Sequence, residues 1–327
     1  MPVISYIQAV TTALREEMQR DDKVFILGED VGKKGGVFRA TDGLYEEFGE
    51  SRVLDTPLAE SAIAGVGIGA AMYGMRPVAE MQFADFIMPA VNQIISEAAK
   101  MRYRSNNDWQ APITIRAPYG GGVHGALYHS QSVEAIFANQ PGLKIVMPST
   151  PYDVKGLLKA SIRDNDPVLF FEHKRAYRLL KGEVPEDDYV LPIGKADIKR
   201  EGTDVTVITY GLAVHFALQA AEKLAEEGID VHILDLRTIY PMDKEAIIAA
   251  AQKTGKVLLV TEDNKEGSII GEAAAIIAEN CLFDLDAPIS RLAGPDVPAM
   301  PYAPPMEKYF MLNPDKVEAA IRDLAEF

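Results

Sequence analysis

The feature that most constrains the fold of this chain is a regular alternation of short apolar runs with stretches of helical periodicity. The apolar runs lie at 24–30, 52–56, 78–83, 113–118, 143–149 and 167–173. Helical patterns separate them, after Pro57 and at 84–104, 132–139 and 152–163. Strands that alternate with helices form a mostly parallel sheet with helices on both faces. We therefore predict a doubly wound α/β fold.

A second series of the same kind follows a charged interval that contains Pro and Gly. Its predicted strands are 204–211, 231–238, 256–263 and 288–295, and its predicted helices are 213–227, 243–254, 268–280 and 314–326. A chain of 327 residues has room for two domains. We predict an α/β domain at 1–185, a linker at 186–203 and a second α/β domain at 204–327.

Composition excludes several classes of protein. Cys281 is the single cysteine, so neither an intrachain disulfide nor a zinc site of several cysteines is possible. A net charge of −15 disfavours nucleic-acid binding. No uncharged apolar run reaches the length of a membrane span, and the first residues alternate apolar and charged side chains. We expect no signal peptide, no membrane partner and a cytoplasmic location.

One acidic residue stands out in the stretch DTPLAESAIAGVGIGAAM, which begins at Asp55. Thr56 suits a helix N-cap and Pro57 the first helical position. From Leu58 to Met72 the only polar side chains are Glu60 and Ser61, and a helix that is apolar on all sides is expected to be buried. Glu60 either complements the helix dipole or is a poorly solvated carboxyl group kept for chemistry. The stretch alone leaves both open.

Other polar and aromatic side chains are expected at the same edge of the sheet, beyond the carboxyl ends of the strands, where open α/β sheets bind ligands. Gln82, Phe83 and Phe86 follow one strand, and a glycine-rich loop with His124 and His129 follows another. Each aromatic ring has the alternative of a core role, and each histidine that of a structural role. The loop also matches the dinucleotide pattern G-x-G-x-x-G at Gly120–Gly125, but the ribose-binding acid that should follow is missing.

Several long segments together resemble one family over the whole chain. They are DTPLAESAIAGVGIGAAMYGMRP, EMQFADF, APYGGGVHGALYHSQSVEA, PGLKIVMPSTPYD and DLRTIYP. The family is that of the beta subunits of the thiamine-diphosphate-dependent decarboxylase component of 2-oxo acid dehydrogenase complexes. The segments MPAVNQIISEAAKMRYRS and GALYHSQS are most similar to the members specific for branched-chain 2-oxo acids, with pyruvate and acetoin dehydrogenase beta subunits as close alternatives.

The resemblance implies two transketolase-like domains and an α2β2 heterotetramer with thiamine diphosphate at each α–β interface. In the family the alpha subunit carries a GDG…N motif that holds magnesium and the diphosphate. This chain has no GDG sequence. It is therefore expected to bind only part of the cofactor.

The resemblance also implies roles for individual residues. Glu60 matches the carboxyl group that hydrogen-bonds the cofactor's aminopyrimidine and so promotes removal of the thiazolium proton. Leu58, Gln82 and Phe83 match positions around the pyrimidine. Phe86 replaces a tyrosine of some branched-chain members, which leaves a ring contact only.

The active-site histidine of the family matches His129. It is implied to orient the substrate or the lipoyl group and to move a proton during reductive acyl transfer. His124 is the second choice, with a role in shaping the loop.

A potassium site is implied as well. The matching positions are Ala111, Ile113, Thr114, Ser161, Asp164 and Asp166. Carbonyl and carboxylate oxygens suit such a hard ion. The sequence RDND around Asp164 is also a typical turn, and Ser161 and Asp166 replace a cysteine and an asparagine of some members.

The implied reaction is decarboxylation of a branched 2-oxo acid, a step of branched-chain amino acid degradation, followed by transfer of the acyl group to a lipoyl group on an acyltransferase core. Asp284, Asp286 and the terminal carboxylate of Phe327 are candidate contacts with that core. Two further readings stay open: a nicotinamide-dependent oxidoreductase that uses the Gly120–Gly125 loop, and a noncatalytic scaffolding subunit.

Overall fold

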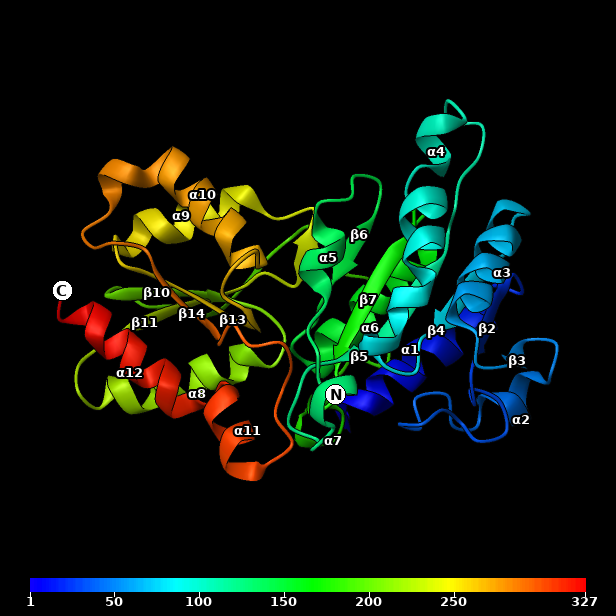
Figure 1. Ribbon diagram of the computed structural model, residues 1–327, viewed down its shortest axis with the longest axis horizontal. Helices are drawn as coiled ribbons and strands as arrows, with labels where there is room; N and C mark the ends of the chain where they lie inside the picture. Colours follow the sequence, from blue (N-terminus) through cyan, green and yellow to red (C-terminus); the bar gives the residue numbers. More distant parts are fainter. The chain divides into compact units, whose positions relative to one another are not determined.

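The computed structural model describes residues 1–327, which form two compact units. Unit 1 comprises Met1–Tyr119 and Ile136–Ile193, and unit 2 comprises Gly120–Ala135 and Gly194–Phe327. Each unit is a sheet with helices on its faces (Figure 1). The predicted α/β fold is confirmed. The predicted boundaries at 185 and 204 stay predictions, but the interval 186–203 contains a strand of the unit 2 sheet.

The main sheet of unit 1 is parallel and runs in the order β6-β7-β5-β4-β2-β3. Its strands are β2 (Val24–Gly28), β3 (Val53–Asp55), β4 (Arg76–Glu80), β5 (Thr114–Tyr119), β6 (Lys144–Val146) and β7 (Val168–His173). Because β3 and β4 flank β2 on opposite sides, the strand order reverses at β2. Such a reversal opens a crevice at the carboxyl ends of the strands.

The helices of unit 1 pack in two groups. Helix α1 (Tyr6–Arg20) packs against α6 (Pro151–Arg163), and α3 (Glu60–Met72) packs against the short helices η1 (Ala84–Ala90) and η2 (Gln93–Ala98). The remaining elements are α2 (Leu44–Phe48), α4 (Met101–Arg104), α7 (Ala176–Leu179) and the antiparallel pair β1 (Val3–Ser5) and β8 (Lys181–Glu183). Helix α5 spans Glu134–Ala138.

The single long helix predicted at 84–104 is wrong. This segment forms a 3-10 helix, a π-helical stretch and the short α4 in succession. Pro89 lies inside η1 and has no N–H to donate, which disfavours a regular α-helix there.

The helix predicted after Pro57 begins later than expected and is not buried on all sides. It begins at Glu60, with Ala59 rather than Thr56 at the N-cap. Ile63, Ala64, Gly67 and Ile68 face the core, whereas Val66 is 58% exposed. Ala62, Gly65 and Gly69 on the helix are exposed as well, and so are Leu58 before it and Tyr73 at its C-cap. The spacing of three and four residues places Ala62, Gly65, Val66 and Gly69 on one side of the helix. The chain therefore leaves an apolar outer face on α3.

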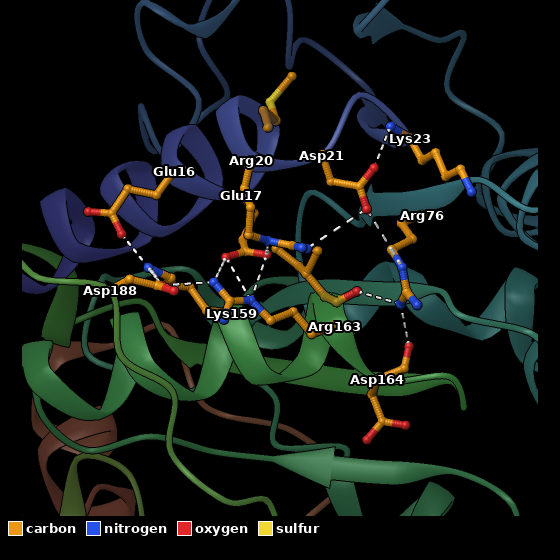
Figure 2. A network of polar contacts seen from close by, with 12 residues as sticks. Glu16, Glu17, Arg20, Asp21, Lys23, Arg76, Lys159, Arg163, Asp164 and Asp188 are labelled. Carbon is orange, nitrogen blue, oxygen red and sulfur yellow. Dashed lines mark hydrogen bonds and ion pairs between the residues drawn. The ribbon is translucent and has the colours of Figure 1, made fainter.

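A network of charged groups joins α1 to α6 (Figure 2). Glu17 is fully buried, and its carboxylate accepts hydrogen bonds from Arg163 at 2.6 Å and from Arg20 at 2.8 Å. Arg76 extends the same region by donating to the main-chain oxygen of Asp164 at 2.8 Å. Two cations around one buried carboxylate compensate its charge, as burial of an acid requires.

A second buried network lies within the unit 1 sheet. Arg116 on β5 donates to both carboxylate oxygens of Glu172 on β7 and to Glu80 on β4, each at 2.6 Å. Tyr177 donates to Glu172 as well. Burial raises the pKa of Glu80 above its ordinary value, although the charge of Arg116 acts in the opposite direction. This network links the three central strands just below their carboxyl ends.

The unit 2 sheet has the order β14-β13-β10-β11-β9 and is parallel except for β9. Its strands are β9 (Asp197–Arg200), β10 (Val205–Thr209), β11 (Val231–Asp235), β13 (Val257–Asn264) and β14 (Ser290–Gly294). Within unit 2, α8 (Ala213–Ala225) and α12 (Pro314–Ala325) lie on one face of the sheet, and α9 (Lys244–Thr254) and α10 (Ile269–Cys281) on the other (Figure 1). The shorter elements are η3 (Ala126–Tyr128), β12 (Thr238–Tyr240), η4 (Leu282–Asp284) and α11 (Pro304–Phe310).

None of the helices is long and apolar enough to cross a lipid bilayer.

Candidate functional site

The candidate site of unit 1 lies at the carboxyl ends of β2, β3 and β4. Glu60 is the first residue of α3 and is partly buried. The segment before it is tied to the end of β2, because Thr56 N–H donates to the carbonyl of Gly28 at 2.9 Å. Leu58 is 70% exposed in the chain. The strand reversal therefore places the Glu60 carboxyl group beside the end of β2.

Residues that follow β4 supply an amide and two aromatic rings to the same edge. Gln82 Nε2 lies 3.5 Å from Asp30 Oδ2, and the Gln82 side chain also hydrogen-bonds Glu29. The rings of Phe83 and Phe86 meet edge to face, with centroids 5.5 Å apart. Gln82, Phe83 and Phe86 are thus brought together, as the sequence predicted, and all three are partly buried.

Phe83 is also fixed by neighbours that the sequence does not reveal. The ring of Phe38 contacts it at a centroid distance of 5.3 Å, and Lys174 Nζ lies 5.5 Å from its centroid. Edge-to-face rings and a cation over a ring face are favourable arrangements. The Phe83 ring is therefore held by both Phe38 and Lys174.

Glu29 is a site residue that the sequence reasoning missed. It follows β2 directly, and burial first, then the charges of Asp30 and Glu60, raise its pKa above the ordinary value. Glu29 and Glu60 are thus close enough for their charges to interact, although 31 positions separate them in the chain. The available signal was the acidic pair Glu29-Asp30 at the end of a strand.

His129 belongs to the segment of 120–135, which is part of unit 2, whereas Glu60 belongs to unit 1. Each of the two predicted catalytic residues is therefore positioned by its own unit. His129 is partly buried. Gly125 makes room for it, because a Cβ at Gly125 would lie 2.7 Å from His129 Cβ.

His124 is mostly exposed, and its Nδ1 lies 2.6 Å from Glu307 Oε2 on α11. Its backbone φ of 55° is unusual for a residue other than glycine. Its ring is held by Glu307, and the loop-shaping role stays a prediction.

The dinucleotide reading of Gly120–Gly125 receives no support. That fingerprint should open a helix whose N-terminus binds the pyrophosphate. Here Gly125 is followed by the three-residue turn η3.

The residues predicted to bind potassium lie in unit 1, and several of their oxygen atoms already have partners within the protein. Lys144 Nζ is 2.6 Å from Asp164 Oδ2, and Arg102 Nε is 2.5 Å from Asp166 Oδ1. The carbonyl oxygen of Ile113 accepts from Val168 N–H at 2.9 Å. Thr114 and Ser161 are buried, as is Ala111.

No group of three or more His, Cys, Asp or Glu side chains is arranged to hold a metal ion. The carboxylates of Asp164 and Asp166 are already neutralised by lysine and arginine. They therefore do not form a preorganised cation site, and potassium binding by these residues stays a prediction.

The predicted contacts with an acyltransferase core lie on the surface of unit 2. Asp284 and Asp286 are exposed, as is the C-terminal Phe327. Phe283 beside them is 99% exposed. A fully exposed aromatic ring next to exposed acids is unusual for a surface that stays in water.

Comparisons with known proteins agree with this architecture. Residues 3–179 match the pyrimidine-binding domain of transketolase, and residues 194–317 match the transketolase C-terminal domain. A solved chain described as a split-gene transketolase in an inactive beta4 tetramer superposes with a TM-score of 0.80, over 99% of this chain and 98% of that one. At 24% identity this likeness concerns the fold alone.

Two curated relatives are much closer in sequence. The chain is 82% identical to the 2-oxoisovalerate dehydrogenase subunit beta of Bacillus subtilis, over the full length of both. It is 48% identical to the pyruvate dehydrogenase E1 component subunit beta of the same organism, again over both full lengths.

Proposed function

Since the chain belongs to the family of 2-oxo acid dehydrogenase beta subunits, we propose that it is the beta subunit of a branched-chain 2-oxo acid dehydrogenase. It decarboxylates branched 2-oxo acids and transfers the acyl group to a lipoyl group, in complex with an alpha subunit and with thiamine diphosphate. We base the choice of substrate on one observation, the much higher identity to the 2-oxoisovalerate relative than to the pyruvate relative.

The residues at the unit 1 edge fit an aminopyrimidine ring. Glu60 offers a carboxyl group, Gln82 an amide, and Phe83 and Phe86 two ring surfaces. These groups suit a flat heterocycle with hydrogen-bonding nitrogens. The diphosphate and magnesium are assigned to the alpha subunit, since this chain lacks the GDG sequence.

When bound, thiamine diphosphate supplies a carbon nucleophile and takes up the electron pair released with carbon dioxide. Glu60 would form the hydrogen bond to a pyrimidine ring nitrogen and would hold the proton between them. Glu29, whose pKa is raised, keeps a proton more readily than an exposed carboxyl group and so limits charge repulsion beside Glu60. Phe83 and Phe86 would offer ring surfaces to the pyrimidine.

His129 acts in the second half of the reaction. It orients the lipoyl group and moves a proton to a lipoyl sulfur as the acyl group is transferred. A histidine on a loop suits this task, because an imidazole can both donate and accept a proton.

The assembly we propose is an α2β2 heterotetramer. The apolar outer face of α3, with Val66 at its centre, supports this, because monomeric proteins rarely leave such a face in water. The exposed Phe283 with Asp284 and Asp286 supports a second contact, with a basic domain of the acyltransferase core.

The test is thiamine-diphosphate-dependent release of carbon dioxide by the chain assembled with its cognate alpha subunit. The substrates are 3-methyl-2-oxobutanoate, 4-methyl-2-oxopentanoate and pyruvate, compared at equal concentration. The branched acids are expected to turn over fastest, and Glu60→Ala to reduce turnover about 100-fold or more. The control is Glu46→Ala, an exposed acid on α2. Faster turnover of pyruvate would contradict the substrate, and an active Glu60→Ala complex would contradict the site.

A further inference from the structure

The loop that carries His129 is part of unit 2 and is held near both ends by other residues of that unit. This loop is the segment of 120–135, which follows strand β5 and includes the first two residues of helix α5. Gly120 N–H donates to the carbonyl of Gln131 at 3.1 Å, which draws its two ends together. His124 and Ala126 have φ values of 55° and 52°. Non-glycine residues persist in this region only where surrounding contacts hold them.

The first contact is made at the beginning of the loop. Gly121 N–H donates to Glu262 Oε1 at 2.6 Å. A Cβ at Gly121 would lie 2.3 Å from Met300 Cε, so the end of the Met300 side chain would have to move. Met300 is itself buried in a small apolar cluster with Phe310 and Met311. The backbone at Gly121 thus lies directly against Glu262 and Met300.

The second contact is made at the end of the loop by Glu134. Tyr210 donates its hydroxyl proton to Glu134 Oε1 at 2.7 Å, and Thr261 Oγ1 lies 2.7 Å from the same hydroxyl. Glu134 and Thr261 are 1% exposed and Tyr210 is 4% exposed. Tyr210 follows β10 directly and Thr261 lies on the adjacent β13.

Glu134 therefore reaches the carboxyl edge of the unit 2 sheet. In open α/β sheets this edge is where a ligand binds. In unit 2 a side chain of the loop lies there instead, in a hydrogen-bonded chain with two adjacent strands.

The groups that face Glu134 make its charged form unfavourable. Burial first, and then the charge of Asp263, raise the pKa of Glu134 to about 8, with a smaller effect of Glu262. The hydrogen bond from Tyr210 acts in the opposite direction. Asp263 also has a raised pKa, of about 6. At neutral pH Glu134 is therefore mainly a neutral carboxylic acid held by hydrogen bonds.

We propose that Glu134 is a positioning residue for the reaction, because it fixes the loop that carries His129 to the carboxyl edge of the unit 2 sheet through Tyr210 and Thr261. The unit 2 sheet thereby contributes to acyl transfer through the position of the loop, and Glu134 itself does not touch the substrate. The part of this inference that concerns acyl transfer rests on the proposed function. The anchoring itself does not.

The anchoring is tested by hydrogen exchange of residues 120–135 in the full-length chain. Glu134→Ala is expected to lower the protection of the loop amides about 10-fold or more, since a buried hydrogen-bonded anchor is lost. Tyr210→Phe removes only the hydroxyl and is expected to lower protection in the same amides. Glu134→Gln retains an acceptor for Tyr210 and is expected to stay within about twofold of the unmodified chain.

The matched control is Asp243→Ala, which removes another buried acid of unit 2. Asp243 caps α9 by accepting from Ala246 N–H at 3.3 Å and is 8% exposed. It is expected to lower thermal stability without a selective effect on residues 120–135. Equal loss of loop protection in Asp243→Ala and Tyr210→Phe, or unchanged protection in both Glu134→Ala and Tyr210→Phe, would overturn the anchoring.

The role in the reaction is tested with the assembled α2β2 complex. Tyr210→Phe and Glu134→Ala are expected to lower acylation of a lipoyl domain about 10-fold, with decarboxylation measured through an artificial electron acceptor changed less than about twofold. Equal losses in both assays would overturn the positioning role. No decarboxylation by the unmodified complex would overturn the proposed function instead, while the exchange experiment would still decide the anchoring.

The pH profile adds a readout that a purely structural role would not change. Above a pH of about 8 Glu134 ionises beside Glu262 and Asp263, so lipoyl acylation is expected to fall. Glu134→Gln cannot ionise and is expected to retain acylation at high pH. An identical alkaline fall in Glu134→Gln and the unmodified complex would contradict the assignment of this limb to Glu134.

Discussion

Glu29 and Glu60 come from different strand–helix connections, yet the charge of Glu60 contributes to the raised pKa of Glu29. They meet because the strand order reverses at β2, which places the ends of β2 and β3 side by side. A neighbouring negative charge disfavours ionisation of a carboxyl group, so Glu29 holds its proton more readily than an isolated acid does.

Replacing Glu60 is expected to change the titration of Glu29. In Glu60→Gln the like charge is removed, so the pKa of Glu29 should fall toward its ordinary value, while the part due to burial remains. The measurement is a carboxyl NMR titration of the full-length chain with labelled glutamate. The control Glu46→Gln, on the exposed side of α2, should leave Glu29 unchanged. A Glu29 titration that is the same in Glu60→Gln would show that the two groups do not interact.

Arg116→Met is expected to destabilise unit 1 strongly. The substitution leaves Glu80 and Glu172 buried without their shared cation, a change that typically costs about 3–5 kcal/mol. Denaturant unfolding of the chain measures this, with Arg178→Met as a control on the exposed surface of α7. The raised pKa of Glu80 means that the folded chain binds this proton more tightly than the unfolded chain does. The contribution of Glu80 to stability is therefore lost as the pH rises above 4.5, the ordinary pKa of the group. An Arg116→Met chain as stable as Arg178→Met would refute the assigned role.

Gly67→Ala is expected to disturb the packing of α3 on the sheet. A Cβ at Gly67 would lie 2.7 Å from Ile113 Cδ1, so the helix or the isoleucine has to move. Overpacking of this kind costs about 1–3 kcal/mol, of which the helix propensity gained on replacing glycine offsets about 0.5–1 kcal/mol. Gly69→Ala is the matched control, because no atom lies within 4 Å of its Cβ position. In the isolated chain this control should stabilise α3 by about 0.5–1 kcal/mol. Comparable thermal midpoints for the two variants would be evidence against close packing at Gly67.

Val66→Asp is expected to prevent assembly while leaving the chain folded. The side chain is 58% exposed on the apolar outer face of α3, so a charge costs little in the isolated chain but much when the face is covered. Size-exclusion chromatography with the alpha subunit measures assembly. The control is Val190→Asp, an exposed valine at 45% in the segment after β8. Normal assembly of Val66→Asp would mean that this face is not a subunit contact.

Sequence patterns predicted the fold well because they concern local periodicity. The alternation of apolar runs and helical patterns gave the strands β2 to β7 and β10 to β14 with small errors at their ends, apart from the short β12. Short edge elements such as β1, β8 and β9 have too few residues for a period to be visible. The helix predicted at 84–104 failed because apolar spacing does not distinguish an α-helix from successive 3-10 and π turns.

The site was predicted less completely, since it depends on which strands are neighbours. Gln82, Phe83 and Phe86 could be found because they share one short segment. Glu29 could not, because its relation to Glu60 follows from the order of β3, β2 and β4. Glu134 was missed for the same reason, as its partners Tyr210 and Thr261 lie on strands far along the chain. Burial was also misjudged at α3, because an apolar sequence does not say which molecule covers it.

The exposed apolar face of α3 affects the amount of this protein that a cell can keep at steady state. While newly synthesised copies wait for an alpha subunit, Val66 and its neighbours are open to solvent. Such surfaces are recognised by chaperones and proteases. We expect unpaired copies to be removed quickly, so that the supply of the alpha subunit sets the steady amount of this one. Pulse-chase half-lives measured with and without coexpressed alpha subunit would reveal this dependence, and equal half-lives would exclude it.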